Sequence, residues 1–182
     1  MPSEEYENYL NKISKYLNKI SKSIIEACEL IQEKYNGNPA NMFSKNKYMA
    51  PEIYFILRQL PGVGPKKASM IVRDFVAKSG VFEIGGKRLE VEGKELADVP
   101  VDIHVFNVFK RIMGEYQNEQ YRPQDYWPDI QNFAKLTFPE FPAKLDYVFW
   151  SIGRKYCGEN NPNCNECPLQ DVCEYAESIN KK

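Results

Sequence analysis

Four of the five cysteines of this chain stand close together near its C-terminal end. They are Cys157, Cys164, Cys167 and Cys173, in the spacing C-x6-C-x2-C-x5-C. Two cysteines separated by two residues can converge on one metal, and the flanking cysteines can complete a four-thiolate site for zinc or for an iron–sulfur cluster. Thiolates alone do not choose between the two. The spacing therefore predicts a metal centre that ties down the C-terminal part of the fold.

A pair of disulfides is the alternative use of these cysteines. Residues 1–5 have neither a basic start nor an apolar run, so we expect no secretory signal peptide. We therefore expect a cytoplasmic protein, and in that reducing compartment such a spacing more often binds metal. The apolar runs are far too short to cross a membrane, so no membrane partner is expected.

The length of 182 residues suits one domain, or two tightly packed lobes that share a core. The net charge of −1 gives no support to a nucleic-acid partner. Any contact with nucleic acid therefore has to come from local basic groups.

A long amphipathic helix is predicted from Glu5 to Tyr35. Its apolar residues recur at intervals of three and four, which is the spacing of a helix stripe. The stripe consists of Leu10, Ile13, Leu17, Ile20, Ile24, Ala27 and Ile31. In one interpretation the stripe packs on the core. In the other it pairs with a partner helix, since its residues keep heptad register. Cys28, alone on this helix, is expected in the core.

Two further helices are predicted on either side of a glycine turn. The first opens at Pro51, and the second follows Pro65 and stops at Ser79-Gly80. Between them, Gly62, Val63 and Gly64 allow a tight turn, and the N–H groups that open the second helix form an anion site. With Lys66 and Lys67 adjoining it, this helix-hairpin-helix is predicted to bind phosphate.

The spacing of apolar residues changes after this unit. Apolar and polar residues alternate on both sides of Gly85-Gly86, which predicts a β-hairpin. Helices are then predicted after Asp102, from about Pro128 to Leu136, and from Ala143 to Tyr156. We expect an all-α fold with this small β-hairpin and a C-terminal metal-binding loop. The expected divisions are the N-terminal helix 1–37, a helix-hairpin-helix lobe 38–115 with the insertion 81–97, and a C-terminal helical lobe 116–182 with the cysteine loop 157–173.

Three motifs occur here in the order found in the endonuclease III family, within the helix-hairpin-helix, Gly/Pro-rich, Asp superfamily of DNA glycosylases. They are Leu60-Pro61-Gly62-Val63-Gly64-Pro65-Lys66-Lys67-Ala68, then Val101-Asp102-Ile103-His104-Val105-Phe106, then the four-cysteine tail. The resemblance runs from about Lys19 to Ala176, with Gly153-Arg154 ahead of the first cysteine. It implies a helical glycosylase fold, and it implies that the four cysteines bind a four-iron, four-sulfur (4Fe-4S) cluster rather than zinc.

The resemblance also implies catalytic roles, because Lys66 falls on the family's catalytic lysine and Asp102 on its catalytic aspartate. A bifunctional DNA glycosylase and AP lyase would act on double-stranded DNA with a damaged base or an abasic site. The lysine amine attacks the sugar C1′ and forms a Schiff base, from which β-elimination breaks the strand. Asp102 stabilises the cationic sugar or accepts protons, and the target nucleotide is flipped out first.

Simpler roles exist for the same residues. Lys66 has the position of a phosphate-contacting lysine, and Asp102 that of a helix N-cap. His104 is expected to be structural. The chain would then be a non-catalytic iron–sulfur DNA-binding module or a subunit of a repair complex. Lys66 and Asp102 together favour the enzyme, because a module that only binds DNA has no need of both.

The chain departs from the family pattern in three places. The family has further helices before the segment that matches Lys19 to Gly37, so the resemblance implies an N-terminally shortened member. A homodimer or a partner subunit, recruited through the first helix, would complete it. The insertion 81–97 is expected to emerge beside the active site. Relatives carry basic residues between the first two cysteines, so here Arg154 and Lys155 are expected to contact DNA instead. We expect a nucleoid-associated protein.

Overall fold

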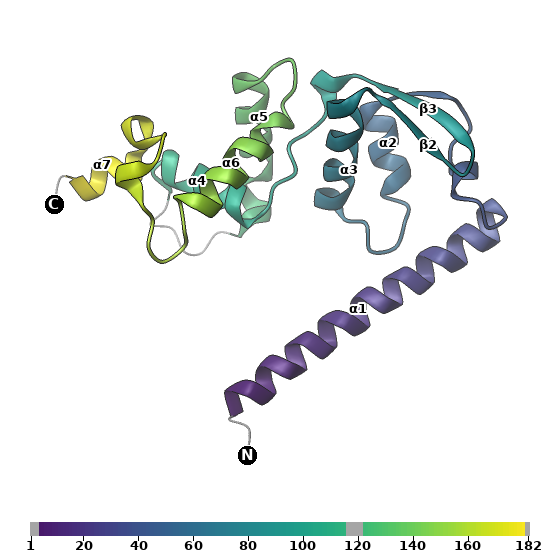
Figure 1. The fold of residues 1–182 in the computed structure, drawn as a ribbon, viewed down its shortest axis with the longest axis horizontal. Coiled ribbons are helices and arrows are strands. Elements are labelled where there is room, and N and C mark those ends of the chain that lie inside the picture. Colours follow the sequence, from purple (N-terminus) through teal and green to yellow (C-terminus); the bar gives the residue numbers. More distant parts are fainter. Residues whose placement is uncertain (1–3, 116–121, 181–182) are drawn as a thin grey trace.

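The computed structural model describes residues 4–115 and 122–180. Its helices are α1 (Glu4–Tyr35), α2 (Ala50–Leu57), α3 (Pro65–Lys78), α4 (Ile103–Ile112), α5 (Trp127–Thr137), α6 (Lys144–Lys155) and α7 (Glu174–Asn180). Its strands are β1 (Lys47–Met49), β2 (Val81–Ile84) and β3 (Lys87–Glu92). Figure 1 shows α2, α3 and the sheet on one side, α4 to α7 on the other, and α1 projecting from the first group. The expected helical fold with a small β insertion is confirmed.

A small sheet covers one side of α2 and α3. Its strand order is β1-β3-β2, with β1 parallel and β2 antiparallel to β3. The predicted hairpin forms because Gly85 and Gly86 both take positive φ, as its two-residue turn requires. The strand β1 was not predicted, since three residues are too few to show a period. Tyr48 of β1 pairs with Val91 of β3, and both are buried.

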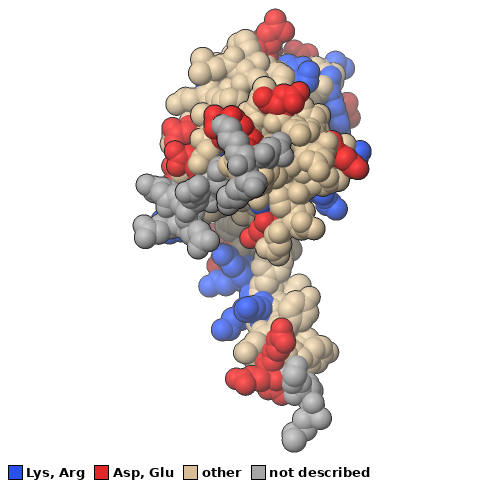
Figure 2. All heavy atoms as spheres, turned by 90° about the vertical axis from the view of Figure 1, so that its left-hand side faces the viewer, with Lys and Arg blue, Asp and Glu red and all other residues tan. Residues whose placement is uncertain are grey.

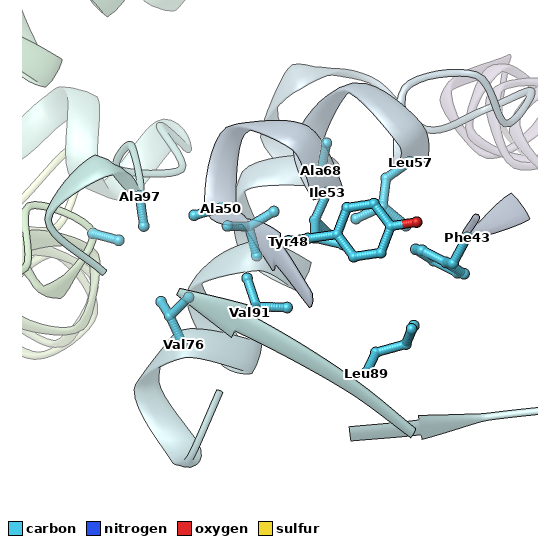
Figure 3. Close-up of a cluster of buried hydrophobic side chains, with 12 residues drawn as sticks. Phe43, Tyr48, Ala50, Ile53, Leu57, Ala68, Val76, Leu89, Val91 and Ala97 are labelled. Atoms are coloured by element: carbon cyan, nitrogen blue, oxygen red, sulfur yellow. The ribbon is translucent and has the colours of Figure 1, made fainter. Parts of the chain in front are cut away.

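The first hydrophobic cluster lies between this sheet and the two helices (Figure 3). Ile53 of α2, Ala68 of α3 and Leu89 of β3 are completely buried in it. Figure 3 shows Phe43 and Tyr48 together at one side of the cluster, and their rings meet edge to face at 5.9 Å. The cluster therefore fixes α3, the helix whose first turn carries Lys66.

The second hydrophobic cluster joins α4, α5 and α6. Helices α4 and α6 approach closely at Gly153, where an added Cβ would lie 2.7 Å from the Cβ of His104. The imidazole of His104 meets the ring of Trp150 edge to face at 6.5 Å. The absence of a side chain at Gly153 thus sets the first turn of α4 against the last turns of α6.

The helix α1 does not pack as one interpretation of its stripe required. It has no buried residue, and Leu10 and Leu17 are 46% and 55% exposed. Cys28 is exposed, so its expected place in the core was wrong. The physical reason is the direction of α1. Its C-terminal part meets the body, from Ser23 beside Gly62 to Tyr35, which donates to the side chain of Gln59, and its N-terminal part projects away (Figure 1).

The hairpin of β2 and β3 lies away from Lys66, at the opposite end of α3 (Figure 1). Its tip packs against the segment after α1, where a Cβ at Gly85 would meet the side chains of Asn38 and Ala40. The ammonium of Lys87 bonds the carbonyl of Phe43. The expectation that the insertion emerges beside the active site was therefore wrong, because pairing with β1 holds it on the other side of the first cluster.

The expected boundary at residue 116 lies outside the described residues. Within the described ranges, no helix combines the length and the apolar character needed to span a bilayer.

Candidate active site and cysteine pocket

The glycine hairpin between α2 and α3 is closed by its own backbone. Val63 N–H donates to the Leu60 carbonyl at 3.0 Å, and Gly62 takes a φ of +78°. Gly62 lies against α1, since an added Cβ would be 2.6 Å from the Cβ of Ser23. The region beside Gly64 is open, because an added Cβ there would meet only a guanidinium nitrogen of Arg58 at 4.0 Å. One side of the hairpin is thus covered by α1 while the backbone at Gly64 stays accessible.

Two lysines follow the hairpin in the first turn of α3, and they point to different partners. Lys67 Nζ donates to the Gly62 carbonyl at 2.9 Å, which closes the turn from outside. Lys66 Nζ lies 4.0 Å from Asp102 Oδ2. The side chain of Lys66 is 45% exposed and that of Asp102 is 13% exposed, so the ammonium faces solvent while the carboxylate is held inside.

Asp102 is held by the helix that it caps. Its Oδ1 accepts the N–H groups of His104 and Val105, both at 2.9 Å, and this satisfies two donors at the start of α4. Its other oxygen is the one that faces Lys66. The structure therefore brings Lys66, on the helix of the first cluster, to Asp102, on a helix of the second.

A cavity of about 610 Å³ adjoins Lys66. It lies between α1 and the hairpin, and its lining includes the rings of Tyr16 and Trp127 and the side chains of Lys19 and Lys66. Aromatic faces beside ammonium groups suit a flat, polar ring attached to a phosphate.

The two basic residues predicted on the C-terminal side stand at the end of α6. Arg154 lies over the ring of Trp150 at 4.9 Å, and Lys155 over the ring of Tyr156 at 4.8 Å. The pKa of Lys155 is raised, chiefly by its hydrogen bond with the side chain of Tyr156. Because Gly153 contacts His104, this end of α6 lies beside the start of α4, which Asp102 caps.

The four clustered cysteines line one small cavity of about 20 Å³, together with Arg111 and Tyr175. Burial raises the pKa of the Cys157 thiol and that of the Cys164 thiol. Binding a metal there has to displace these protons, since the thiolate is the ligand.

Arg111 of α4 organises the start of the cysteine loop. Its guanidinium donates to the carbonyls of Cys157 at 3.0 Å, Gly158 at 2.8 Å and Glu159 at 2.8 Å. It also lies 3.2 Å from Cys157 Sγ, where its charge favours the thiolate.

The donor set fits an iron–sulfur cluster in number and kind. All four cysteines are free thiols that face one cavity. Zinc and iron–sulfur clusters both take four thiolates, so the donor set admits either one. Among the described residues, no three cysteine, histidine or acidic side chains are grouped closely enough to hold one ion.

Comparison with known proteins finds sequence similarity to DNA repair enzymes. No family model matches it. Endonuclease III of Escherichia coli strain K12 is 26% identical over 160 residues, which are 86% of this chain and 58% of that protein. Thymine-DNA glycosylase of Aeropyrum pernix is 26% identical over 156 residues, which are 84% and 56% of the two chains. This chain is similar to endonuclease III. The resemblance predicted from the three motifs is confirmed.

The solved non-covalent complex of endonuclease III with DNA has the same fold. The match has a TM-score of 0.60 and 23% identity, and it covers 100% of this chain and 69% of that one. The chain spans 58% of the length of the Escherichia coli endonuclease III sequence.

Sequence reasoning missed two arginines in this endonuclease III-like fold. Arg111 stands in the last turn of α4, where a basic residue is common for the sake of the helix dipole. Arg73 is buried inside α3. Arg111 binds carbonyls of the cysteine loop and Arg73 contacts Asp146, and these partners lie far away in the sequence, so no local pattern could have shown the contacts.

Proposed function

We propose that this chain is a base-excision repair enzyme, a bifunctional DNA glycosylase and AP lyase that works on double-stranded DNA in the nucleoid. The observation that carries the proposal is the approach of Lys66 Nζ to 4.0 Å from Asp102 Oδ2 beside an open glycine hairpin. Similarity to endonuclease III and to a thymine-DNA glycosylase supports this class of reaction.

Lys66 is the proposed nucleophile. Once its ammonium loses a proton, the amine attacks C1′ of a nucleotide flipped into the neighbouring cavity, and the bond from C1′ to the base breaks. The C1′–O4′ bond of the sugar ring then opens, O4′ takes a proton, and the open-chain sugar is held as a Schiff base on Lys66. Removal of a proton from C2′ expels the 3′ phosphate, which is β-elimination, and water releases the lysine. At an abasic site the same steps start from the open-chain aldehyde.

Asp102 is proposed to act through the oxygen that faces Lys66. A fixed carboxylate at this place stabilises positive charge that develops on the sugar as the base departs. It costs little reorganisation, because the two N–H groups of α4 already hold the carboxylate in place.

DNA phosphates are proposed to bind at the hairpin and at the end of α6. The backbone of Gly62, Val63 and Gly64 and the first N–H groups of α3 offer an anion site. Lys67 adds positive charge next to it. Arg154 and Lys155 are exposed at the end of α6 that adjoins α4.

The cysteine pocket is proposed to hold a 4Fe-4S cluster in preference to zinc. Such a cluster would cross-link the loop 157–173 and so supply rigidity to the C-terminal part. Arg111 would hold the first turn of that loop and favour the thiolate form of Cys157.

The exposed stripe of α1 is proposed to pair with α1 of a second copy. Residues 9–14 and 16–21 repeat Tyr-Leu-Asn-Lys-Ile-Ser, and in an antiparallel pair the exposed Ile13 of one helix lies opposite the exposed Leu17 of the other. Figure 2 shows lysines (blue) on the projecting part of α1, with glutamates (red) at its tip. The lysines at 12, 15, 19 and 22 follow the stripe by two positions each, which places them on the opposite face of the helix. The seam therefore holds no like charges that would oppose pairing.

Strand cleavage tests the proposed function. A labelled duplex with one abasic site should be cut to a product that carries an unsaturated aldehyde, and a panel with oxidised pyrimidines or damaged purines should identify the base that is excised. Tight binding to these duplexes without any cleavage would contradict the enzyme and indicate a DNA-binding module.

A further inference from the structure

A buried ion pair joins the two halves of the described fold. Arg73 of α3 and Asp146 of α6 are each 7% exposed, and the guanidinium contacts the carboxylate directly. The first residue belongs to α3, whose first turn carries Lys66, and the second to α6, which packs on α4. No step proposed above uses either of them.

The neighbouring residues on both helices strengthen this contact. Asp74 accepts from Arg73 Nε at 2.9 Å, and it also accepts from the hydroxyl of Tyr147 at 3.2 Å. The guanidinium stacks on the ring of Tyr147, 4.6 Å from its centroid. Two adjacent residues of α3 therefore meet two adjacent residues of α6, which fixes both the distance and the rotation between the helices.

The same two helices lead to the proposed catalytic pair. Lys66 and Arg73 are seven residues apart on α3, and Asp146 and Gly153 are seven apart on α6. A spacing of seven is about two turns, or about 10 Å, and it returns to the same face of a helix. Gly153 in turn contacts His104, whose N–H is bonded by Asp102. The ion pair thus lies about two turns along α3 and α6 from the ends of these helices that lead to Lys66 and Asp102.

We propose that Arg73 and Asp146 are positioning residues that set the separation of Lys66 from Asp102. This inference rests on the proposed function. A buried ion pair is poor evidence for stability, because apolar residues of similar size often stabilise a fold as well or better. The contribution of the forked guanidinium is instead that it holds α3 and α6 in one defined relative position. The reaction needs such geometry, since an error of about 1 Å at the reacting atoms can cost about a hundred-fold in rate.

The test replaces both partners together, so that no charge is left buried alone. In Arg73→Met/Asp146→Leu we expect thermal unfolding at the wild-type temperature or above it. Single-turnover cleavage of abasic duplex should then keep its half-saturating protein concentration, while its maximal rate falls by roughly a hundred-fold. Arg73→Lys, which keeps the charge but loses the fork, should give an intermediate rate.

The control is a second ion pair, which lies within the small β-sheet. Lys47 and Glu92 pair at 2.6 Å between β1 and β3. Lys47→Gln/Glu92→Gln should leave the maximal rate unchanged.

Several outcomes would overturn the inference. A double variant with the wild-type maximal rate would show that the pair does not position the site. A rate that falls only in proportion to unfolded protein, in the double variant and in Arg73→Lys alike, would show a purely structural role. Cleavage by the wild type separates these outcomes from failure of the proposed function. If the wild type does not cleave the duplex, the proposed function and this inference are both wrong.

Discussion

Asp102 divides its two carboxylate oxygens between two tasks. One oxygen accepts two N–H groups and caps α4, and the other faces Lys66. Capping alone would be a sufficient reason for an aspartate there, so position in the sequence cannot separate the roles. Substitution can, because asparagine caps a helix about as well as aspartate but carries no charge.

We predict that Asp102→Asn folds with a free energy of unfolding close to that of the wild type. Its rate of cleavage should fall on the order of a hundred-fold, because the charge opposite the developing cation is gone. Asp102→Ala should lose the same activity and also about 1 kcal/mol of stability, since the cap is lost. Urea unfolding and single-turnover cleavage give the two quantities. Full activity in Asp102→Asn would leave capping as the only role.

A tyrosine next to the buried ion pair should add a pH dependence to stability. The pKa of Tyr147 is raised, chiefly by burial. Folding therefore favours the protonated hydroxyl, and the resulting stability is complete below the unfolded pKa of about 10. It is lost as the pH rises through the higher folded pKa. Tyr147→Phe should show a shallower loss of unfolding free energy between about pH 9 and 11. An equal slope in both proteins would contradict this.

At the scale of elements, the sequence predicted what local patterns determine. The bounds of α3 and the turn at Gly85 and Gly86 were predicted because a period and a glycine pair mark them. The strand β1 has three residues and shows no period. The stripe of α1 predicted a helix correctly but could not tell whether the body lies beneath it. Likewise, the motifs named Lys66 and Asp102, but only the fold reveals the contacts of Arg73 and Arg111.

The fit of the hairpin against α1 makes Gly62 hard to replace. Gly62→Ala introduces a Cβ at positive φ and also sets it 2.6 Å from the Cβ of Ser23. Gly86 has a similar φ of +79° but open space around it. Both substitutions should cost about 1–2 kcal/mol for the backbone, and Gly62→Ala should cost more because of the clash. Thermal melts of the two variants, and of Gly62→Ala/Ser23→Gly as a rescue, test this. Equal losses without rescue would place α1 elsewhere.

The cysteine loop should depend on Arg111. Arg111→Met removes three bonds to loop carbonyls and the charge beside Cys157. We expect purified protein with less iron per chain than the wild type, and faster loss of the brown colour with an iron chelator. Arg122→Met is the control, because Arg122 is an exposed residue outside the cysteine cavity. Wild-type iron retention in Arg111→Met would show that the loop holds without this arginine.

The whole molecule leaves α1 projecting with an apolar stripe on its surface (Figure 1). Exposed stripes of this kind commonly mark interaction sites. We predict a dimer in light scattering after size exclusion, and a monomer for Leu10→Glu/Leu17→Glu, since both side chains lie in the proposed seam. Lys12→Glu/Lys19→Glu changes the opposite face and should remain dimeric. A monomeric wild type at all concentrations would rule out self-pairing.

Borohydride trapping on a duplex with one abasic site tests the role of Lys66 as nucleophile. Reduction of the Schiff base should link the wild-type protein to DNA covalently. Lys67→Ala should still form the adduct at saturating DNA, since Lys67 bonds the hairpin and does not face Asp102. Lys66→Ala should form none. Trapping that survives in Lys66→Ala, or no trapping from folded, cluster-loaded wild type, would contradict Lys66 as the nucleophile.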